Sequence, residues 1–144
     1  MLRNMLLLAT LVAGTLLTLP TLASHHAPLP GVTIRNGTLI GVSNNDTGVQ
    51  KFLGIPYAQP PVGNLRLRQA IPLNSSFGTL HATTFGYSCY GAKSQPNSSE
   101  DCLTLNIWRP ESAASEEGLP VLVWLYGGGL TEGYTVSTLG TCQS

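Results

Sequence analysis

The feature that most constrains this chain is an unbroken apolar run at residues 121–126, VLVWLY, which is followed at once by three consecutive glycines. The run shows none of the apolar–polar alternation that marks a strand with one solvated face. It is typical of a strand covered on both faces, as the central parallel strands of α/β proteins are. The run therefore predicts a buried strand in a covered sheet, although the chain offers almost no amphipathic helical pattern to cover it.

Residues 1–24 have the layout of a secretory signal peptide. Arg3 precedes an apolar run at residues 5–19, and Pro20 and small residues follow as far as Ser24. The alternative, a membrane anchor, is disfavoured because the run is shorter than the roughly 20 residues that a bilayer core requires. We therefore expect a secreted, extracellular protein with no stable membrane anchor.

Four Asn-x-Ser/Thr sequons agree with export. Each lies in a stretch rich in Gly, Ser, Asn or Asp, where a turn could present a glycan to water. A type I′ hairpin turn is expected at Asn36-Gly37, between two β-rich arms, with Asn36 at its exposed tip. The candidate glycan acceptors are Asn36, Asn45, Asn74 and Asn97.

Two further stretches indicate local structure. Residues 103–108, LTLNIW, alternate apolar and polar side chains, which predicts a strand with one covered face. Residues 69–95 are mostly Ser, Gly, Thr and Asn with scattered aromatics, which predicts irregular surface loops.

Charge and metal-ligand patterns exclude several classes of partner. Seven basic and seven acidic residues cancel, and no block of like charge occurs, so nucleic acid and acidic lipid are not expected partners. His25 and His26 are read as solvated residues, because two adjacent histidines do not complete a metal site. In an oxidising compartment the three cysteines are disulfide candidates, and one of them is left over: Cys89, Cys102 and Cys142.

Three motifs in order carry a family resemblance: FLGIPYAQPPVGNLRLR, SEDCLTLNIWRP and LPVLVWLYGGGL. Together they closely resemble the N-terminal portion of the type-B carboxylesterases, the α/β-hydrolase group that includes cholinesterases and extracellular fungal lipases. The resemblance covers about residues 32–134, whereas residues 135–144 are an atypical tail. It implies an α/β fold in which residues 25–144 are the truncated N-terminal part of an α/β-hydrolase domain, with a β-hairpin and the first strands of the central sheet. It implies no metal and no organic cofactor.

The resemblance also gives the glycines a chemical role. Ester hydrolysis passes through a tetrahedral oxyanion, which preorganised backbone N–H groups stabilise. Glycine lets the backbone approach a substrate closely, and in α/β-hydrolases one such N–H comes from an HGGG-type loop. The implied donors are Gly128 and Gly129, with Tyr126 in place of the His and Leu130 where Phe is more usual. The alternative, a merely flexible turn, is disfavoured by the apolar run and by the upstream EDCLTLN block.

Other residues match structural features of the same family. The resemblance implies a disulfide between Cys89 and Cys102, worth about 3 kcal/mol for so short a loop. It also implies a buried or half-buried salt bridge between Arg66 and Glu100, held by two parallel hydrogen bonds. The loop between the two cysteines contains no Trp, so cholinesterase activity is disfavoured.

No catalytic triad is evident in the sequence. The string nearest to G-x-S-x-G surrounds Ser88, but its second glycine comes one residue too late, and His81 precedes any possible nucleophile. We therefore expect a fragment of a secreted carboxylic ester hydrolase, a carboxylesterase or lipase, that is inactive without a triad. The alternatives are a secreted non-catalytic binding or adhesion protein of the same fold, and a truncated product that does not fold. The ester substrate and the oligomeric state stay open.

Overall fold

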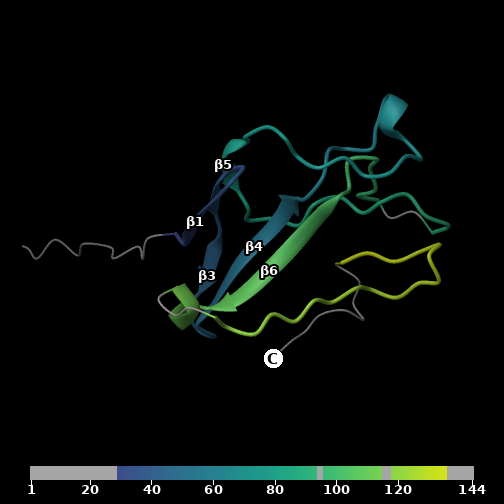
Figure 1. Ribbon diagram of the computed structural model, residues 1–144. Helices are drawn as coiled ribbons and strands as arrows, with labels where there is room; N and C mark the ends of the chain where they lie inside the picture. The colour runs from purple at the N-terminus through teal and green to yellow at the C-terminus, as the bar shows by residue number, and fades with distance from the viewer. Residues whose placement is uncertain (1–28, 94–95, 115–117, 136–144) are drawn as a thin grey trace, which may run out of the picture.

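The computed structural model describes residues 29–93, 96–114 and 118–135 (Figure 1). These residues form two three-stranded sheets and two short 3₁₀-helices, η1 (Gly63–Leu65) and η2 (Glu111–Ala114), with no α-helix among them. The expected signal peptide, the two adjacent histidines and Cys142 lie outside the described residues.

The first sheet joins a hairpin to a distant strand. Strands β1 (Gly31–Ile34) and β2 (Gly37–Ile40) are antiparallel, which confirms the expected hairpin. Strand β5 (Gly78–His81) pairs with β2 in parallel, with Leu80 opposite Leu39. It interrupts the predicted run of irregular loops, because pairing with β2 supplies the order that its polar sequence does not indicate.

The expected type I′ turn is wrong. Ile34 pairs with Gly37, so the central turn residues are Arg35 and Asn36, and neither has the positive φ that type I′ requires. Gly37 takes the positive φ instead, at 143°. Asn36 is also half-buried rather than an exposed tip, since its side chain turns back onto the segment before β5.

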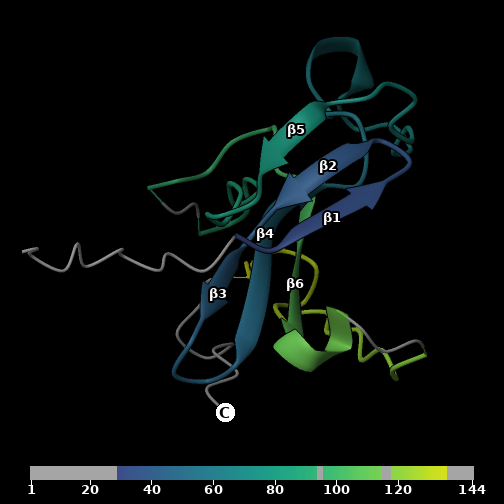
Figure 2. The same ribbon diagram turned by 90° about the vertical axis from the view of Figure 1, so that its left-hand side faces the viewer.

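The second sheet is antiparallel, with the order β3 (Val42–Asn44), β4 (Val49–Pro56) and β6 (Thr104–Pro110). The predicted strand at residues 103–108 is thereby confirmed as β6, but its expected covered face is wrong, because Leu105, Ile107 and Trp108 are exposed in the described structure. Buried Gly41 lies between β2 and β3, where the chain passes from one sheet to the other. Figure 2 shows the strands of the two sheets running in clearly different directions.

An irregularity in β4 connects the two sheets. The register with β6 shifts between Phe52 and Ile55, and within this bulge the N–H of Gly54 donates to Asn106 Oδ1 at 2.8 Å. The N–H of Leu53 donates to the carbonyl of Ala82, just after β5, at 2.8 Å. The N–H of Ala82 in turn donates to Ile40 in β2 at 2.8 Å. A short path of backbone hydrogen bonds therefore joins one sheet to the other.

The core lies around this junction. Its buried members come from both sheets and from the residue after β5, and each large apolar side chain contributes about 1.5–3 kcal/mol when fully buried. Val32, Phe77 and Leu80 pack against it. The core members are Leu39, Phe52, Ile55 and Ala82.

The apolar run at residues 121–126 is not a buried strand, which corrects the sequence-based expectation. It makes no strand pairing (Figure 1). Its side chains are exposed, with Leu122 at 91% and Trp124 at 73%. A strand needs a neighbour to complete its hydrogen bonds, and the described residues place no strand beside this run. The apolar composition of residues 121–126 favours burial, but the other described residues do not supply the layers that would cover this run.

We expect Gly54→Ala to lower the free energy of unfolding by about 2–4 kcal/mol. Gly54 has φ 67°, and an added Cβ would lie 2.7 Å from the carbonyl oxygen of Thr84, so strain and overpacking combine. Gly48→Ala is the matched control, because Gly48 has φ 62° but no atom within 4 Å of the added Cβ. Urea unfolding of both variants measures the difference, and equal losses would contradict the packing argument.

Candidate functional site

The glycine segment folds around one carbonyl group. The carbonyl oxygen of Gly128 accepts hydrogen bonds from the N–H groups of Thr131 and Glu132, both at 3.1 Å, and from Thr131 Oγ1 at 3.2 Å. Positive φ values at Gly128, Gly129 and Leu130, of 143°, 61° and 62°, turn the backbone tightly enough for this. We call residues 127–133 the glycine loop.

This arrangement fixes the direction of a neighbouring donor. The carbonyl of Gly128 and the N–H of Gly129 belong to one planar trans peptide and point in opposite directions. Because three donors hold the carbonyl on the inside of the loop, the Gly129 N–H faces away from them. Gly128 and Gly129 are both exposed, and within the described structure neither N–H has a backbone acceptor.

A second loop, residues 88–93, lies against the glycine loop. The N–H of Ala92 donates to the carbonyl of Thr131 at 2.8 Å, and Lys93 Nζ contacts Glu132 Oε2 at 3.0 Å. Between the two loops is a hollow of about 280 Å³ with a mixed lining of tyrosine, glycine, polar and charged residues. The lining includes Ser88, Tyr90, Tyr126, Leu130 and Tyr134.

The disulfide between Cys89 and Cys102 is present, with the two Cα atoms 5.1 Å apart. Cys102 comes shortly before β6, so the disulfide attaches loop 88–93 to the second sheet. Loop 88–93 in turn holds the glycine loop through Thr131 and Glu132. The disulfide and these contacts therefore connect the glycine loop to the second sheet.

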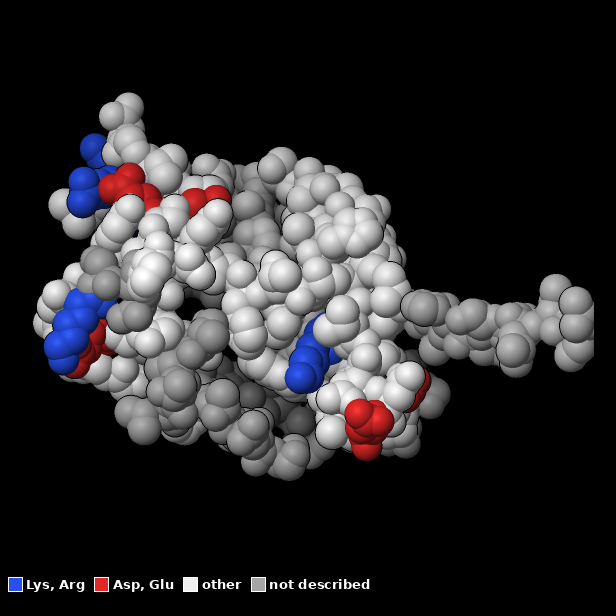
Figure 3. Space-filling model, turned by 180° about the vertical axis from the view of Figure 1, so that it is seen from behind, with Lys and Arg blue, Asp and Glu red and all other residues white. Residues whose placement is uncertain are grey.

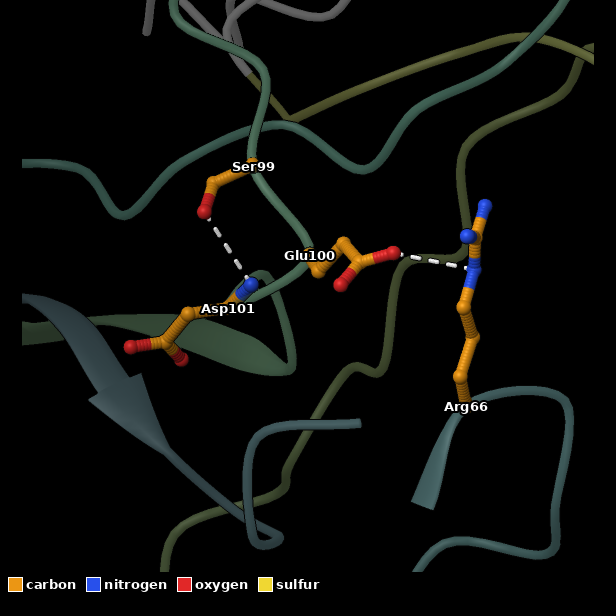
Figure 4. A network of polar contacts seen from close by, with 4 residues as sticks. All are labelled: Arg66, Ser99, Glu100 and Asp101. Carbon is orange, nitrogen blue, oxygen red and sulfur yellow. Dashed lines mark hydrogen bonds and ion pairs between the residues drawn. The ribbon is translucent and has the colours of Figure 1, made fainter. Parts of the chain in front are cut away.

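The salt bridge between Arg66 and Glu100 forms, but it is neither buried nor bidentate. Arg66 Nε lies 2.9 Å from Glu100 Oε1, and Figure 4 draws this single contact. The side chains are 64% and 34% exposed, because the Arg66 loop projects into solvent. Beside it, the N–H of Asp101 donates to Ser99 Oγ at 3.1 Å. An exposed single-contact pair contributes only about 0–1 kcal/mol.

Ser88 and His81 are not brought together as a catalytic pair. Ser88 is half-buried in the lining of the hollow, where its N–H donates to the carbonyl of Asn97 at 3.1 Å. His81 is exposed in β5, opposite Ile40, and does not line the hollow. Within the part of the chain that the structure describes, no hydrogen bond joins the two side chains.

Sequence reasoning missed three residues that shape the site. Asn106 supports the β4 bulge, while Lys93 and Glu132 connect the two loops. Asn106 occupies a regular polar position of the alternating stretch, so the sequence does not distinguish it from a solvated residue. Lys93 and Glu132 are far apart in sequence and carry no signal of their contact.

The described residues contain no group of three or more His, Cys, Asp or Glu side chains placed to hold a metal ion. No helix in this portion of the chain has the length and apolar character needed to span a bilayer. On the face drawn in Figure 3, acidic and basic side chains lie in small separate groups of both signs.

Comparison with known proteins agrees with this architecture. The family model described as "Carboxylesterase family" matches residues 28–141. Fumonisin B1 esterase from Sphingopyxis macrogoltabida is 41% identical over 105 residues, which cover 69% of this chain and 19% of that protein. Lipase 2 from Diutina rugosa is 34% identical over 143 residues, which cover 81% and 26% respectively. A solved structure named PNB esterase superposes with a TM-score of 0.68 at 37% identity, covering 77% of this chain and 23% of the other.

This chain therefore belongs to the carboxylesterase family. Its solved neighbours are esterases of the α/β-hydrolase fold, so the two sheets are a part of that fold. The chain spans about a fifth to a quarter of the length of the curated relatives it matches.

We expect Gly128→Ala to open the glycine loop, because an added Cβ would overlap the carbonyl oxygen of Glu132. The amides of Thr131 and Glu132 should then exchange with solvent roughly tenfold faster or more, as their acceptor moves away. Gly127→Ala is the control, since no atom lies within 4 Å of its added Cβ. Hydrogen exchange followed by NMR measures both, and equal exchange rates in the two variants would refute the loop geometry.

Replacing both Cys89 and Cys102 with Ser should lower the free energy of unfolding by about 3 kcal/mol, by releasing the closed loop in the unfolded chain. Faster exchange of the Ala92 amide should accompany the loss, because loop 88–93 is no longer attached to the second sheet. Arg66→Gln serves as a comparison that removes only an exposed contact. Unchanged exchange at Ala92 would show that the disulfide does not position this loop.

Proposed function

We propose that this chain carries the oxyanion loop of a secreted carboxylic ester hydrolase, a carboxylesterase or lipase. The observation that carries the proposal is the Gly128 carbonyl, which three donors hold inward while the N–H groups of Gly128 and Gly129 stay unbonded and exposed. Relatives named as esterases and lipases support the same reaction class.

In this role the two glycine N–H groups stabilise the negative charge that develops on the ester carbonyl oxygen. Preorganised donors of this kind need no rearrangement as the charge appears, and removing one costs about 10²–10³ in kcat. The hollow between the glycine loop and loop 88–93, which three tyrosines help to line, would receive part of the ester. The substrate is thus a carboxylic ester bound beside the glycine loop.

The described residues supply the proposed donors but no nucleophile paired with a base. Donors stabilise an intermediate only after a nucleophile has formed it, and the described residues hold no paired serine and histidine. The 144-residue chain alone is therefore expected to be inactive towards esters.

Export completes the proposal. The apolar leader at residues 1–24 and the sequons support a location outside the cell, where a disulfide such as that between Cys89 and Cys102 persists. The sequons can receive glycans only if the protein is exported.

A chimaera tests the role of the glycine loop. Residues 29–135 replace the matching segment of PNB esterase, and hydrolysis of nitrophenyl esters is measured. We expect turnover by the chimaera and none by the isolated chain, with Gly128→Ala lowering kcat of the chimaera roughly 10²-fold and Gly127→Ala changing it little.

Thermal unfolding of the chimaera provides the control for folding. A chimaera that unfolds cooperatively yet shows the same kcat with Gly128→Ala would refute the oxyanion role. Turnover by the isolated chain that a serine-directed organophosphate abolishes would show that a nucleophile is present in these 144 residues.

A further inference from the structure

Asn36 differs from the other sequon asparagines in what its side chain does. Its Nδ2 atom donates to the carbonyl oxygens of Leu73 and Ser75, each at 3.1 Å. Carbonyl oxygens only accept hydrogen bonds, so the atom that faces them is the amide nitrogen, and both of its hydrogens are engaged. We call this pair of hydrogen bonds the Asn36 clamp.

The other three sequon asparagines have no such engagement. All three side chains are exposed, and none of their amides donates a hydrogen bond to another described residue. They are Asn45, Asn74 and Asn97.

The Asn36 clamp aligns the start of β5. The backbone carbonyl of Asn36 also accepts a hydrogen bond from the N–H of Phe77 at 2.8 Å. One residue of the hairpin turn thus holds the segment from Leu73 to Phe77 through three hydrogen bonds. The next residue, Gly78, pairs with Gly37 and begins the parallel register of β5 with β2.

Glycosylation would remove what the clamp needs. The transfer forms a C–N bond between the anomeric carbon of a sugar and Nδ2, breaks the bond from that carbon to a lipid-linked pyrophosphate, and releases one amide proton. The modified nitrogen keeps a single hydrogen, so it can satisfy only one of the two carbonyl groups. The sugar would also occupy the space where the segment before β5 lies against the turn.

We infer that Asn36 is a structural amide that carries no glycan in the folded protein, and that Asn45, Asn74 and Asn97 are the glycan acceptors. The assignment of the three glycan acceptors rests on the proposed secretion, whereas the Asn36 clamp does not depend on secretion. A chain that received a glycan at Asn36 before folding would lose the alignment of β5.

Site occupancy is measured on the full chain secreted by a eukaryotic host. Enzymatic release of N-glycans in H₂¹⁸O converts each occupied Asn to labelled Asp, which peptide mass spectrometry locates. We expect label at Asn45, Asn74 and Asn97 and none at Asn36 in the folded monomer. Label at Asn36 in that fraction overturns the inference. Absence of label at every site of the secreted chain would overturn the assignment of Asn45, Asn74 and Asn97 as glycan acceptors.

Two variants made in a host without glycosylation test the clamp directly. Asn36→Asp keeps the shape but removes both donors, so the Phe77 amide should exchange at least about tenfold faster. Thr38→Val destroys the sequon and keeps Asn36, so it should leave Phe77 protected. Equal exchange at Phe77 in Asn36→Asp and the unmodified chain would refute the clamp, as would a Phe77 amide without protection in the unmodified chain.

Discussion

The described structure depends on the carbonyl and N–H groups of Ala82, which connect the two sheets. Ala82 is buried and follows β5, and it bonds to Ile40 on one side and to Leu53 on the other. The Leu53 bond exists because β4 is bulged, and Asn106 satisfies the neighbouring amide of Gly54. The core residues Leu39, Phe52 and Ile55 pack around this junction. Backbone hydrogen bonds and the burial of apolar side chains therefore stabilise the same part of the structure.

Much of the local structure could be predicted because short-range patterns determine it. The hairpin of β1 and β2 follows from β-rich arms around a turn, and β6 follows from the alternation of its side chains. The family resemblance gave the pairing of Cys89 with Cys102, which spacing alone leaves open among three cysteines.

Long-range structure was less accessible to prediction. The partner of β5 is β2, distant in sequence, and a polar stretch that pairs in parallel has no periodic signal of its own. The contact of Lys93 with Glu132 likewise depends on how two loops meet. For residues 121–126, hydrophobicity indicates that the run should be shielded from water but not which strand lies beside it. A turn at the three glycines could be predicted, whereas the inward carbonyl of Gly128 required coordinates.

The exposed run VLVWLY has a consequence for how the protein behaves in solution. It is extended, uncharged and free of proline, and its backbone makes no strand pairing in the described structure. Segments of this kind stack edge to edge with their own copies, and such stacking becomes more favourable as more copies are present. For the described residues taken alone, we therefore expect self-association through this run to increase with protein concentration.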